Sequence, residues 1–553
     1  MDPRVPELQT DLLIVGASCG GVAAAMAAAS AGVSCVLTEP TDWIGGQLTS
    51  QGVPPDENRW VESIDDIGAT RLYKTFREGC RAWYRANRPL KVARSRDPEF
   101  NPGGGWVSRL CVEPRVAHEV LRNMLRPHQS AGRVTLLTHH TVVGADTEGD
   151  RIRSVCLLDR TGNERVIAAK MVLDATEDGE LLELAHVEHA IGAEHRAVYG
   201  EMHGRIDRDD PTDQQGPTWC FAVEHREGED HTIDRPAGYD GWARYVPSMA
   251  PGEQPWTGRL FSWTVPSHNE SGSRDFPLVP WPDQPAMDEW ELWRYRRIVD
   301  RAAYRLTTAT APPDVSLMNC VQIDYWREPT LGVTPEAREA AYAAAREQAR
   351  SFLYWMQTEA PRHDGKGTGY PGLRLRGDEL GTDDGFAKRP YIREPRRLLA
   401  MQMLTEAHVG TEQRRAERRP HMDATEFGTA EPFADSIGVG HYHIDLHPTP
   451  AGRNSVYVPA APYRIPLGSL IPRRVRNLLA ASKCLGVSHV VNGSTRVHHS
   501  EWGIGEAAGV LAAQCLLDGT EPHAVYEDRS RIDQVKQRLT ARGAPLRWPW
   551  EQD

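Results

Sequence analysis

The most regular pattern of apolar and small residues lies near the N-terminus. A short apolar run at 11–15 leads into a Gly-rich segment at 16–21, and an Ala-rich stretch follows at 22–31. A second apolar run at 33–37 then leads to Glu39. This order predicts a buried parallel strand, a tight turn, a helix and a second strand, which together form a βαβ unit.

The predicted βαβ unit carries the features of a dinucleotide site. Gly16 permits the tight turn, Gly21 permits close packing of helix and strand, and the helix N-terminus favours a pyrophosphate. Ser18 stands where a second glycine is usual, and it is small enough for close backbone approach. Glu39 can accept hydrogen bonds from ribose hydroxyls, which disfavours the 2′-phosphate of NADP. The predicted contact residues are Gly16, Ser18, Gly20, Gly21, Glu39 and Pro40.

Other apolar runs indicate more strands and three longer helices. Strands are predicted at 136–145, 152–159, 166–173 and 477–481, and helices at 287–307, 334–357 and 503–517. The region 205–290 is rich in Pro, Asp, Gly and Trp, which is typical of loops and short strands.

Several segments match those of a known family. Gly45-Gly46-Gln47-Leu48 follows Glu39 after a short loop, Asp174-Ala175-Thr176 ends an apolar run, and Gly440-His441-Tyr442 lies further on. With other segments up to 496–502, these resemble the FAD-dependent oxidoreductase family, whose N-terminal module has the glutathione-reductase-type fold, related to fumarate-reductase-like flavoproteins. The resemblance implies that FAD is the cofactor. It adds Gly46, Gln47, Leu48, Val142, Ala175, Thr176, Gly505 and Glu506 to the cofactor-binding residues.

The resemblance also implies the domain organisation. The fold class is α/β, with a Rossmann-like FAD-binding domain that is discontinuous and an α+β substrate or cap domain. The predicted FAD-binding domain comprises 1–55, 105–185 and 468–525, with an inserted segment at 56–104 near the flavin. The cap domain comprises 186–467, and 526–553 form a C-terminal tail.

Composition and charge narrow the partners. The chain has 553 residues, a formal net charge of −12 and no basic face for a nucleic acid. Its nine cysteines form no Cys-x-x-Cys pair, and the N-terminus lacks the pattern of a signal peptide. The uncharged stretch 12–38 has too few large apolar residues for a membrane helix. We therefore expect a cytoplasmic protein that binds a small-molecule substrate, without a nucleic acid or a membrane, and whether it forms a homo-oligomer stays open.

Candidate catalytic residues lie in the predicted cap and before the last helix. Arg393 could bind a substrate carboxylate or pair with a glutamate. His441, His443, Asp445 and His447 alternate, so on a strand they would share one face. That face could be structural, could present a catalytic histidine to the flavin, or could bind a metal with two of its residues. His498 is a further acid–base candidate, and Tyr370 lies in the family-like segment 369–374.

These features favour an FAD-dependent oxidase or dehydrogenase that moves a hydride between a small polar substrate and flavin N5. No second Rossmann unit for NAD(P)H is visible in the sequence. The alternatives are a flavin-dependent monooxygenase or hydroxylase, a metal-dependent hydrolase or lyase built on 441–447, and a redox-silent nucleotide-binding module.

Overall fold

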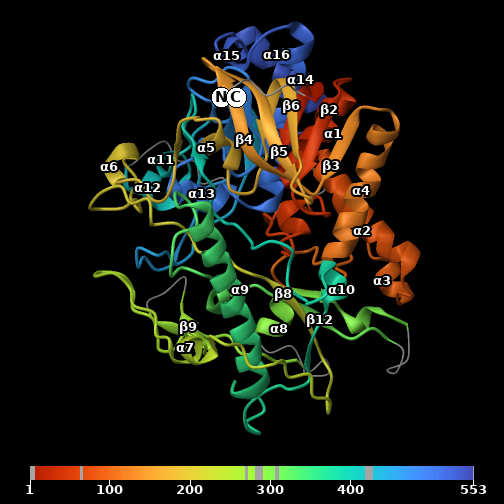
Figure 1. The fold of residues 1–553 in the computed structure, drawn as a ribbon, viewed down its shortest axis with the longest axis vertical. Helices are drawn as coiled ribbons and strands as arrows, with labels where there is room; N and C mark the ends of the chain where they lie inside the picture. The colour runs from red at the N-terminus through yellow and green to blue at the C-terminus, as the bar shows by residue number, and fades with distance from the viewer. Residues whose placement is uncertain are drawn as a thin grey trace.

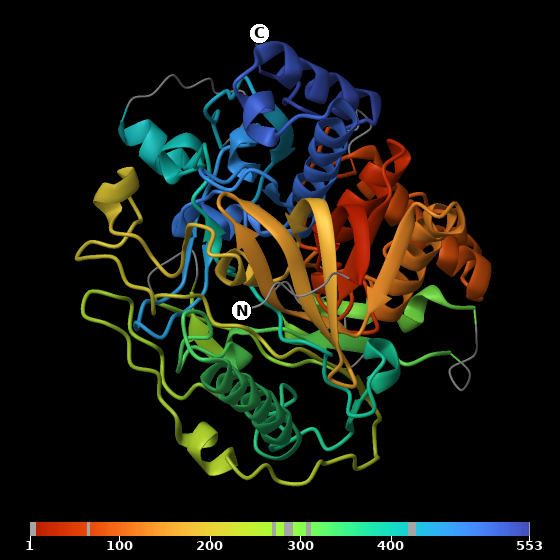
Figure 2. The same ribbon diagram turned by 45° about the horizontal axis from the view of Figure 1, so that its top comes forward.

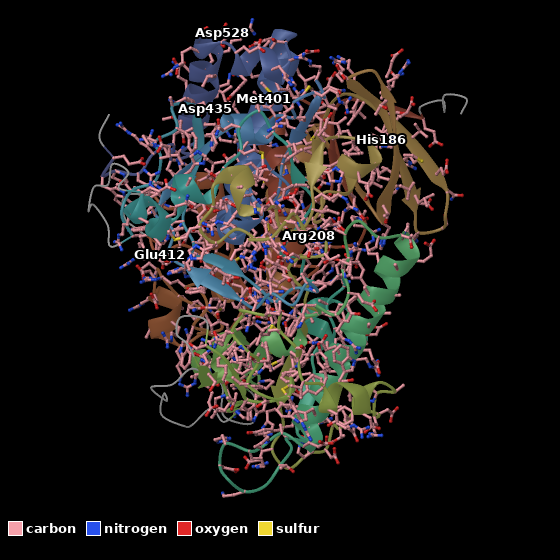
Figure 3. All side chains as sticks on the ribbon, turned by 90° about the vertical axis from the view of Figure 1, so that its left-hand side faces the viewer. His186, Arg208, Met401, Glu412, Asp435 and Asp528 are labelled. Carbon is pink, nitrogen blue, oxygen red and sulfur yellow. The ribbon has the colours of Figure 1, made fainter. Side chains whose placement is uncertain are left out.

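The computed structural model describes residues 7–62, 67–267, 272–280, 291–305, 311–417 and 427–551. One half of the molecule is built on a seven-stranded sheet and its helices, and the other surrounds the long helix α9 (Pro335–Thr358) (Figure 1). In the side view of Figure 3, Asp528, before helix α16 (Arg529–Ala541), lies at one end of the molecule and α9 lies toward the other. No helix in these ranges is long and apolar enough to span a bilayer.

The main sheet has the strand order β3-β2-β1-β6-β5-β4, and β19 also pairs with β6. Its strands are β1 (Leu8–Val15), β2 (Cys35–Glu39), β3 (Val134–Thr138), β4 (His140–Glu148), β5 (Arg151–Asp159), β6 (Glu164–Asp174) and β19 (Leu478–Ala480). Strands β3, β2, β1, β6 and β19 are parallel, whereas β4 and β5 form an antiparallel extension. Figure 2 shows β1 and β2 between this extension and helix α4 (Pro114–Ser130). The parallel part confirms the predicted Rossmann-like fold.

Two helices from opposite ends of the chain pack closely on this sheet. Helix α1 (Cys19–Ser30) follows β1, and helix α14 (His498–Asp518) lies against it. A Cβ on Gly505 would lie 2.0 Å from the carbonyl oxygen of Gly20, so the two backbones touch at this crossing. Both helices are almost entirely buried, which explains why their sequences are rich in Ala and Gly rather than amphipathic.

The rest of the described chain consists mainly of short elements. The further helices are α2 (Arg71–Asn87), α3 (Val92–Arg96), α5 (Glu180–Leu184), α6 (Arg196–Tyr199), α7 (Tyr239–Arg244), α8 (Leu292–Tyr295), α10 (Gly377–Leu380), α11 (Glu406–Val409), α12 (Thr411–Ala416), α13 (His489–Thr495) and α15 (Pro522–Tyr526). The further strands are β7 (His189–Ala190), β8 (Phe221–His225), β9 (Thr264–Pro266), β10 (Ser273–Asp275), β11 (Arg297–Val299), β12 (Val315–Met318), β13 (Leu373–Leu375), β14 (Arg397–Leu398), β15 (Ser436–Gly440), β16 (Ile444–Leu446), β17 (Val456–Val458) and β18 (Tyr463–Pro466).

The α9 half has its own hydrophobic core, which is rich in Trp, Phe and Tyr. This core draws its residues from 221–386 and packs α9 against the sheet β11-β12-β8-β13. Buried apolar residues at 398–471 pack instead in the core of the main sheet. The last segment of the predicted cap therefore shares the core of the main sheet. The cap boundaries, 186–467, stay a prediction.

Four predicted elements are wrong in their bounds or type. The predicted strand 136–145 is two strands, because His139 has a φ of 58° and turns the chain. Of the predicted helix 287–307, the described residues form α8, β11 and a 3₁₀ turn, while 287–290 and 306–307 lie outside the described residues. The helix predicted at 503–517 is α14, which begins at His498. The predicted strand at 441–447 is regular only in β16.

Candidate functional site

A pocket of about 500 Å³ lies at the carboxyl ends of β1, β2 and β6. This edge of a parallel sheet is where α/β folds bind nucleotides. Eight of the predicted cofactor-binding residues line the pocket: Gly16, Ser18, Glu39, Pro40, Gly46, Val142, Ala175 and Thr176. The βαβ unit and the Asp-Ala-Thr segment therefore meet in one cavity, as the sequence predicts.

The turn between β1 and α1 forms the floor of this first pocket. Gly16 has a φ of +97°, and a Cβ there would lie 2.4 Å from the carbonyl oxygen of Ala175. The Ser18 hydroxyl caps helix α1, since it accepts a hydrogen bond of 3.2 Å from the Gly21 amide. A helix N-terminus that opens into a pocket through such a turn is suited to binding an anion.

Acidic side chains surround one end of the first pocket. Burial raises the pKa of Glu39 to about 7, although the amide and hydroxyl of Thr41 donate to its carboxylate at 2.9 and 2.7 Å. Burial likewise raises the pKa of Glu180 to about 7, and Asp178 adds to the shift. The Arg389 guanidinium lines the same wall and opposes these shifts.

A band of buried polar side chains extends from the first pocket toward the α9 half. Lys483 Nζ donates to Glu177 Oε2 at 2.5 Å and to the Ile392 carbonyl at 2.7 Å. Gln47 donates to the Glu501 carboxylate, which also accepts from the Gly20 amide at 3.3 Å. Three buried atoms in the band have no hydrogen-bond partner among the described residues: Gln47 Oε1, Gln51 Nε2 and Glu177 Oε1. Unpaired buried polar atoms are costly, so this band has the character of a binding surface.

A second pocket, with about 860 Å³ of empty space including the open solvent at its mouth, lies beyond this band. Its polar walls carry the arginines Arg274, Arg296 and Arg393 together with Asp445 and His447. Its other lining residues are Val265, Phe276, Tyr295, Asn319, Cys320, Val321, Gln322, Tyr442 and Tyr457. The backbone at Ile392 and Arg393 connects the two pockets, because Ile392 contacts the band and the Arg393 side chain lines the second pocket.

His447 and Asp324 form a hydrogen-bonded pair at the wall of the second pocket. His447 Nδ1 lies 2.6 Å from Asp324 Oδ2, and Arg393 lies 3.1 Å from the other carboxylate oxygen. Burial opposes ionisation of Asp324, but Arg393 and His447 hold its pKa below the ordinary value. A carboxylate only accepts, so Nδ1 of His447 carries the proton and Nε2 is the nitrogen that can exchange one. Nε2 lies 3.5 Å from Asp445.

Comparison with known proteins decides the family. The model of the family described as FAD dependent oxidoreductase matches residues 11–539. The chain belongs to this family. It is therefore an FAD-dependent enzyme, and the cofactor predicted from the sequence is confirmed.

Solved structures of flavoproteins are also similar to this oxidoreductase, at low identity. The FrdA subunit of a mutant E. coli quinol fumarate reductase is 12% identical with a TM-score of 0.31, and the match covers 97% of this chain and 74% of that one. The aromatic hydroxylase CabE from angucycline biosynthesis is 16% identical, and the myxobacterial chondrochloren halogenase CndH is 17% identical, each with a TM-score of 0.24. Each of these two matches covers 41% of this chain, together with 38% of CabE and 46% of CndH. No curated protein matches the sequence.

The residues of the first pocket and the buried band fit FAD. The glycine turn leaves room for a pyrophosphate, and Glu39 stands at the end of β2, where a ribose acid is expected. Gln47 Oε1 and Gln51 Nε2 are buried without a partner among the described residues, and Gln51 lines the first pocket. Gln47 Oε1 can accept a hydrogen bond and Gln51 Nε2 can donate one, and the edge of a flavin offers both kinds of partner.

Six other predicted FAD residues lie outside the first pocket's lining. Gly20 and Gly21 lie in α1 and permit close backbone packing, as does Gly505 in α14. Glu506 accepts a hydrogen bond of 3.2 Å from Arg542 Nε. Gln47 lies in the buried band, and Leu48 is in the hydrophobic core. Gly505 and Glu506 lie in the third turn of α14, because this helix begins earlier than predicted.

Of the predicted catalytic residues, only Arg393 lines the second pocket. Tyr370 is in the α9 core, where its hydroxyl donates to the Leu278 carbonyl and accepts from the His363 amide, both at 2.9 Å. His498 accepts a hydrogen bond of 2.9 Å from the Asp56 amide at Nδ1, so Nε2 carries its proton. Burial lowers the pKa of His498 to about 3, so near neutral pH it serves as a donor rather than a base.

The alternating histidines do not share one face. His441 packs against Trp60, with ring centroids 4.8 Å apart, and His443 stacks on Tyr457 at 4.5 Å. His447 points instead to Asp324. The one-face prediction is wrong because only Ile444–Leu446 is a regular strand and His447 lies beyond its end. Within the described ranges, no three His, Cys, Asp or Glu side chains are grouped to hold a metal.

Sequence reasoning did not select His447 as an acid–base residue, nor Asp324 as its partner. His447 was visible in the alternating pattern, but Asp324 has no motif around it and meets His447 only in the folded chain. Arg274 and Arg296 were missed for the same reason.

Proposed function

We propose that this oxidoreductase moves a hydride between a small polar organic substrate in the second pocket and the flavin, with His447 as the proton acceptor or donor. The observation that carries the proposal is the His447–Asp324 pair in a pocket wall beside Arg393. An oriented imidazole with one proton-exchanging nitrogen is a common acid–base group in enzymes.

The residues divide the work by their positions. Asp324 orients the His447 ring and stabilises it when it becomes charged. In the oxidative direction, His447 Nε2 takes the proton of a substrate O–H or N–H group while the adjacent C–H bond loses its hydride. Arg393 is fixed by the Gly216 carbonyl at 2.8 Å and by Asp324, so it can orient a substrate without rearranging.

FAD, held by the first pocket and the buried band, supplies the two-electron acceptor when bound. Gly16, Ser18 and the α1 N-terminus would hold its pyrophosphate, and Glu39 its ribose. Gln47 and Gln51 would contact the portion nearer the second pocket.

Anaerobic bleaching of the flavin absorption tests this proposal. The holoenzyme is mixed with pools of small hydroxylated, amino and carboxylated metabolites, and an active pool should bleach the wild-type flavin. His447→Gln should reduce the bleaching rate at least a hundredfold, because general acid–base catalysis contributes roughly 10²–10⁴-fold. FAD content and reduction by dithionite should be unchanged, since His447 lies outside the first pocket.

His443→Gln is the matched control. His443 lies four residues away and stacks on Tyr457, but it does not line the second pocket. This variant should bleach at nearly the wild-type rate. If His443→Gln is inactive and His447→Gln is active, the assignment of the acid–base residue is wrong.

A further inference from the structure

The second pocket has one arginine whose charge the described residues do not balance. Arg296 pairs with Asp56 at 3.4 Å, and Arg393 pairs with Asp324 at 3.1 Å. In the part of the chain that the structure describes, no carboxylate lies within ion-pair distance of Arg274. Within the described residues, the second pocket therefore has one guanidinium group, that of Arg274, whose charge no carboxylate compensates.

Asp445 is the carboxylate that could have balanced Arg274, but it is already engaged. Its Oδ2 atom accepts a hydrogen bond of 3.0 Å from Arg496 Nη2. The formal charges cancel within each of the ion pairs Arg296–Asp56, Arg393–Asp324 and Arg496–Asp445. Within the described ranges, Arg274 therefore remains as a positive charge in excess.

The surroundings of Arg274 make an anion favourable there. The side chain is half-buried on β10 and lies over the Phe276 ring, with Cζ 5.6 Å from the ring centroid. Its Nε atom is buried without a hydrogen-bond partner in the described chain, and burial lowers its pKa. Two other lining residues, Arg393 and Asn319, also carry buried donors that no described residue satisfies, at Nε and Nδ2. A ligand that brings acceptor oxygens would remove part of this cost.

We propose that the substrate carries one carboxylate group and that Arg274 binds it. A planar guanidinium presents two parallel N–H donors to the two oxygens of a carboxylate. One excess positive charge matches a carboxylate monoanion better than a phosphate dianion. Tyr295, Tyr457 and Phe276 line the same pocket and suit an apolar or aromatic body on the ligand. This inference rests on the proposed function, because it takes the second pocket as the substrate site.

Calorimetric titration of the holoenzyme with benzoate, benzamide and phenyl phosphate tests the assignment without turnover. Benzamide has nearly the shape of benzoate but no charge. We expect benzoate to bind the wild type about tenfold or more tighter than benzamide. Arg274→Gln should weaken benzoate binding by about tenfold to a hundredfold and leave benzamide unchanged. Arg274→Lys should restore part of the affinity, since it keeps the charge but loses the fork.

Arg244→Gln is the control for a changed arginine in the same half of the molecule, because Arg244 pairs with Asp240 on the surface. It should bind benzoate like the wild type. Equal binding of benzoate and benzamide by the wild type would overturn the proposal, even if Arg274→Gln does not fold. Tighter binding of phenyl phosphate than of benzoate, lost in Arg274→Gln, would also overturn it and assign a phosphate.

The two proposals can fail separately. Benzoate binding that depends on Arg274, together with normal bleaching by His447→Gln, would refute the proposed acid–base role and leave the carboxylate site standing. Loss of bleaching in His447→Gln with benzoate binding indifferent to Arg274 would refute the carboxylate site alone.

Discussion

Adding one methyl group at Gly16 should separate the cost of a close backbone approach from the cost of a left-handed conformation. Gly16 and Gly32 have nearly the same φ, +97° and +91°. A Cβ on Gly32 would meet nothing within 4 Å, whereas one on Gly16 would lie 2.4 Å from the Ala175 carbonyl oxygen and 2.7 Å from the Thr176 amide nitrogen. The pair Gly16→Ala and Gly32→Ala is therefore matched in backbone strain and differs in contact.

The magnitudes follow from these distances. The positive φ costs an alanine about 1–2 kcal/mol at either position. The Gly16 contact is about 1 Å shorter than van der Waals contact, so the turn must move away from the end of β6, at a further cost of about 1–3 kcal/mol. Gly32→Ala should thus lose about 1–2 kcal/mol of unfolding free energy, and Gly16→Ala about 2–5 kcal/mol.

Denaturant unfolding of the two variants, with a common slope, measures the difference. The FAD content after gel filtration, measured from visible absorption, should fall in Gly16→Ala and stay complete in Gly32→Ala, because only Gly16 lines the first pocket. Equal losses of stability in both variants, or full FAD retention by Gly16→Ala, would refute the close-approach argument.

Three further expectations concern helix α14 and the Asp324–Arg393 ion pair. Gly503→Ala in α14 should raise stability by up to about 1 kcal/mol through helix propensity. Gly505→Ala should lower stability by about 1–3 kcal/mol, because a Cβ there would collide with α1. Thermal unfolding of the two variants distinguishes these outcomes. Burial raises the pKa of Glu501 to about 7, and a pyrophosphate at the α1 N-terminus would raise it further, so FAD should bind with proton uptake and more tightly at about pH 6 than at about pH 8. In a titration with FAD, Glu501→Gln should lose the part of this pH dependence that Glu501 contributes, while Glu39 and Glu180 keep the rest. Asp324→Asn leaves Arg393 buried without its counterion, so it should lower the unfolding free energy by about 3 kcal/mol. Adding Arg393→Met should recover part of this loss, as measured by denaturant unfolding.

Local sequence patterns were sufficient to predict the elements that form the first pocket. The alternation of apolar runs with Gly-rich turns predicted β1, α1 and β2, because a strand, a glycine turn and a helix are each determined by neighbouring residues. The helix α9 was predicted for the same reason, since it starts with a capping Thr and a Pro. The prediction failed at the start of α14, where residues 498–502 are buried and fit a helix only because α1 and α2 pack around them.

The chain's own sequence therefore determined the fold class and eight of the residues that line the first pocket, because those residues act within short segments whose spacing is visible, and its resemblance to a known family supplied the cofactor. Only the tertiary structure decided the second pocket. Asp324 and His447 are 123 residues apart along the chain, and they meet only because the two segments that carry them fold onto one wall of the second pocket. The unbalanced charge of Arg274 likewise became apparent only when the partners of its neighbours were known, since charge compensation depends on distances in space rather than on order along the chain.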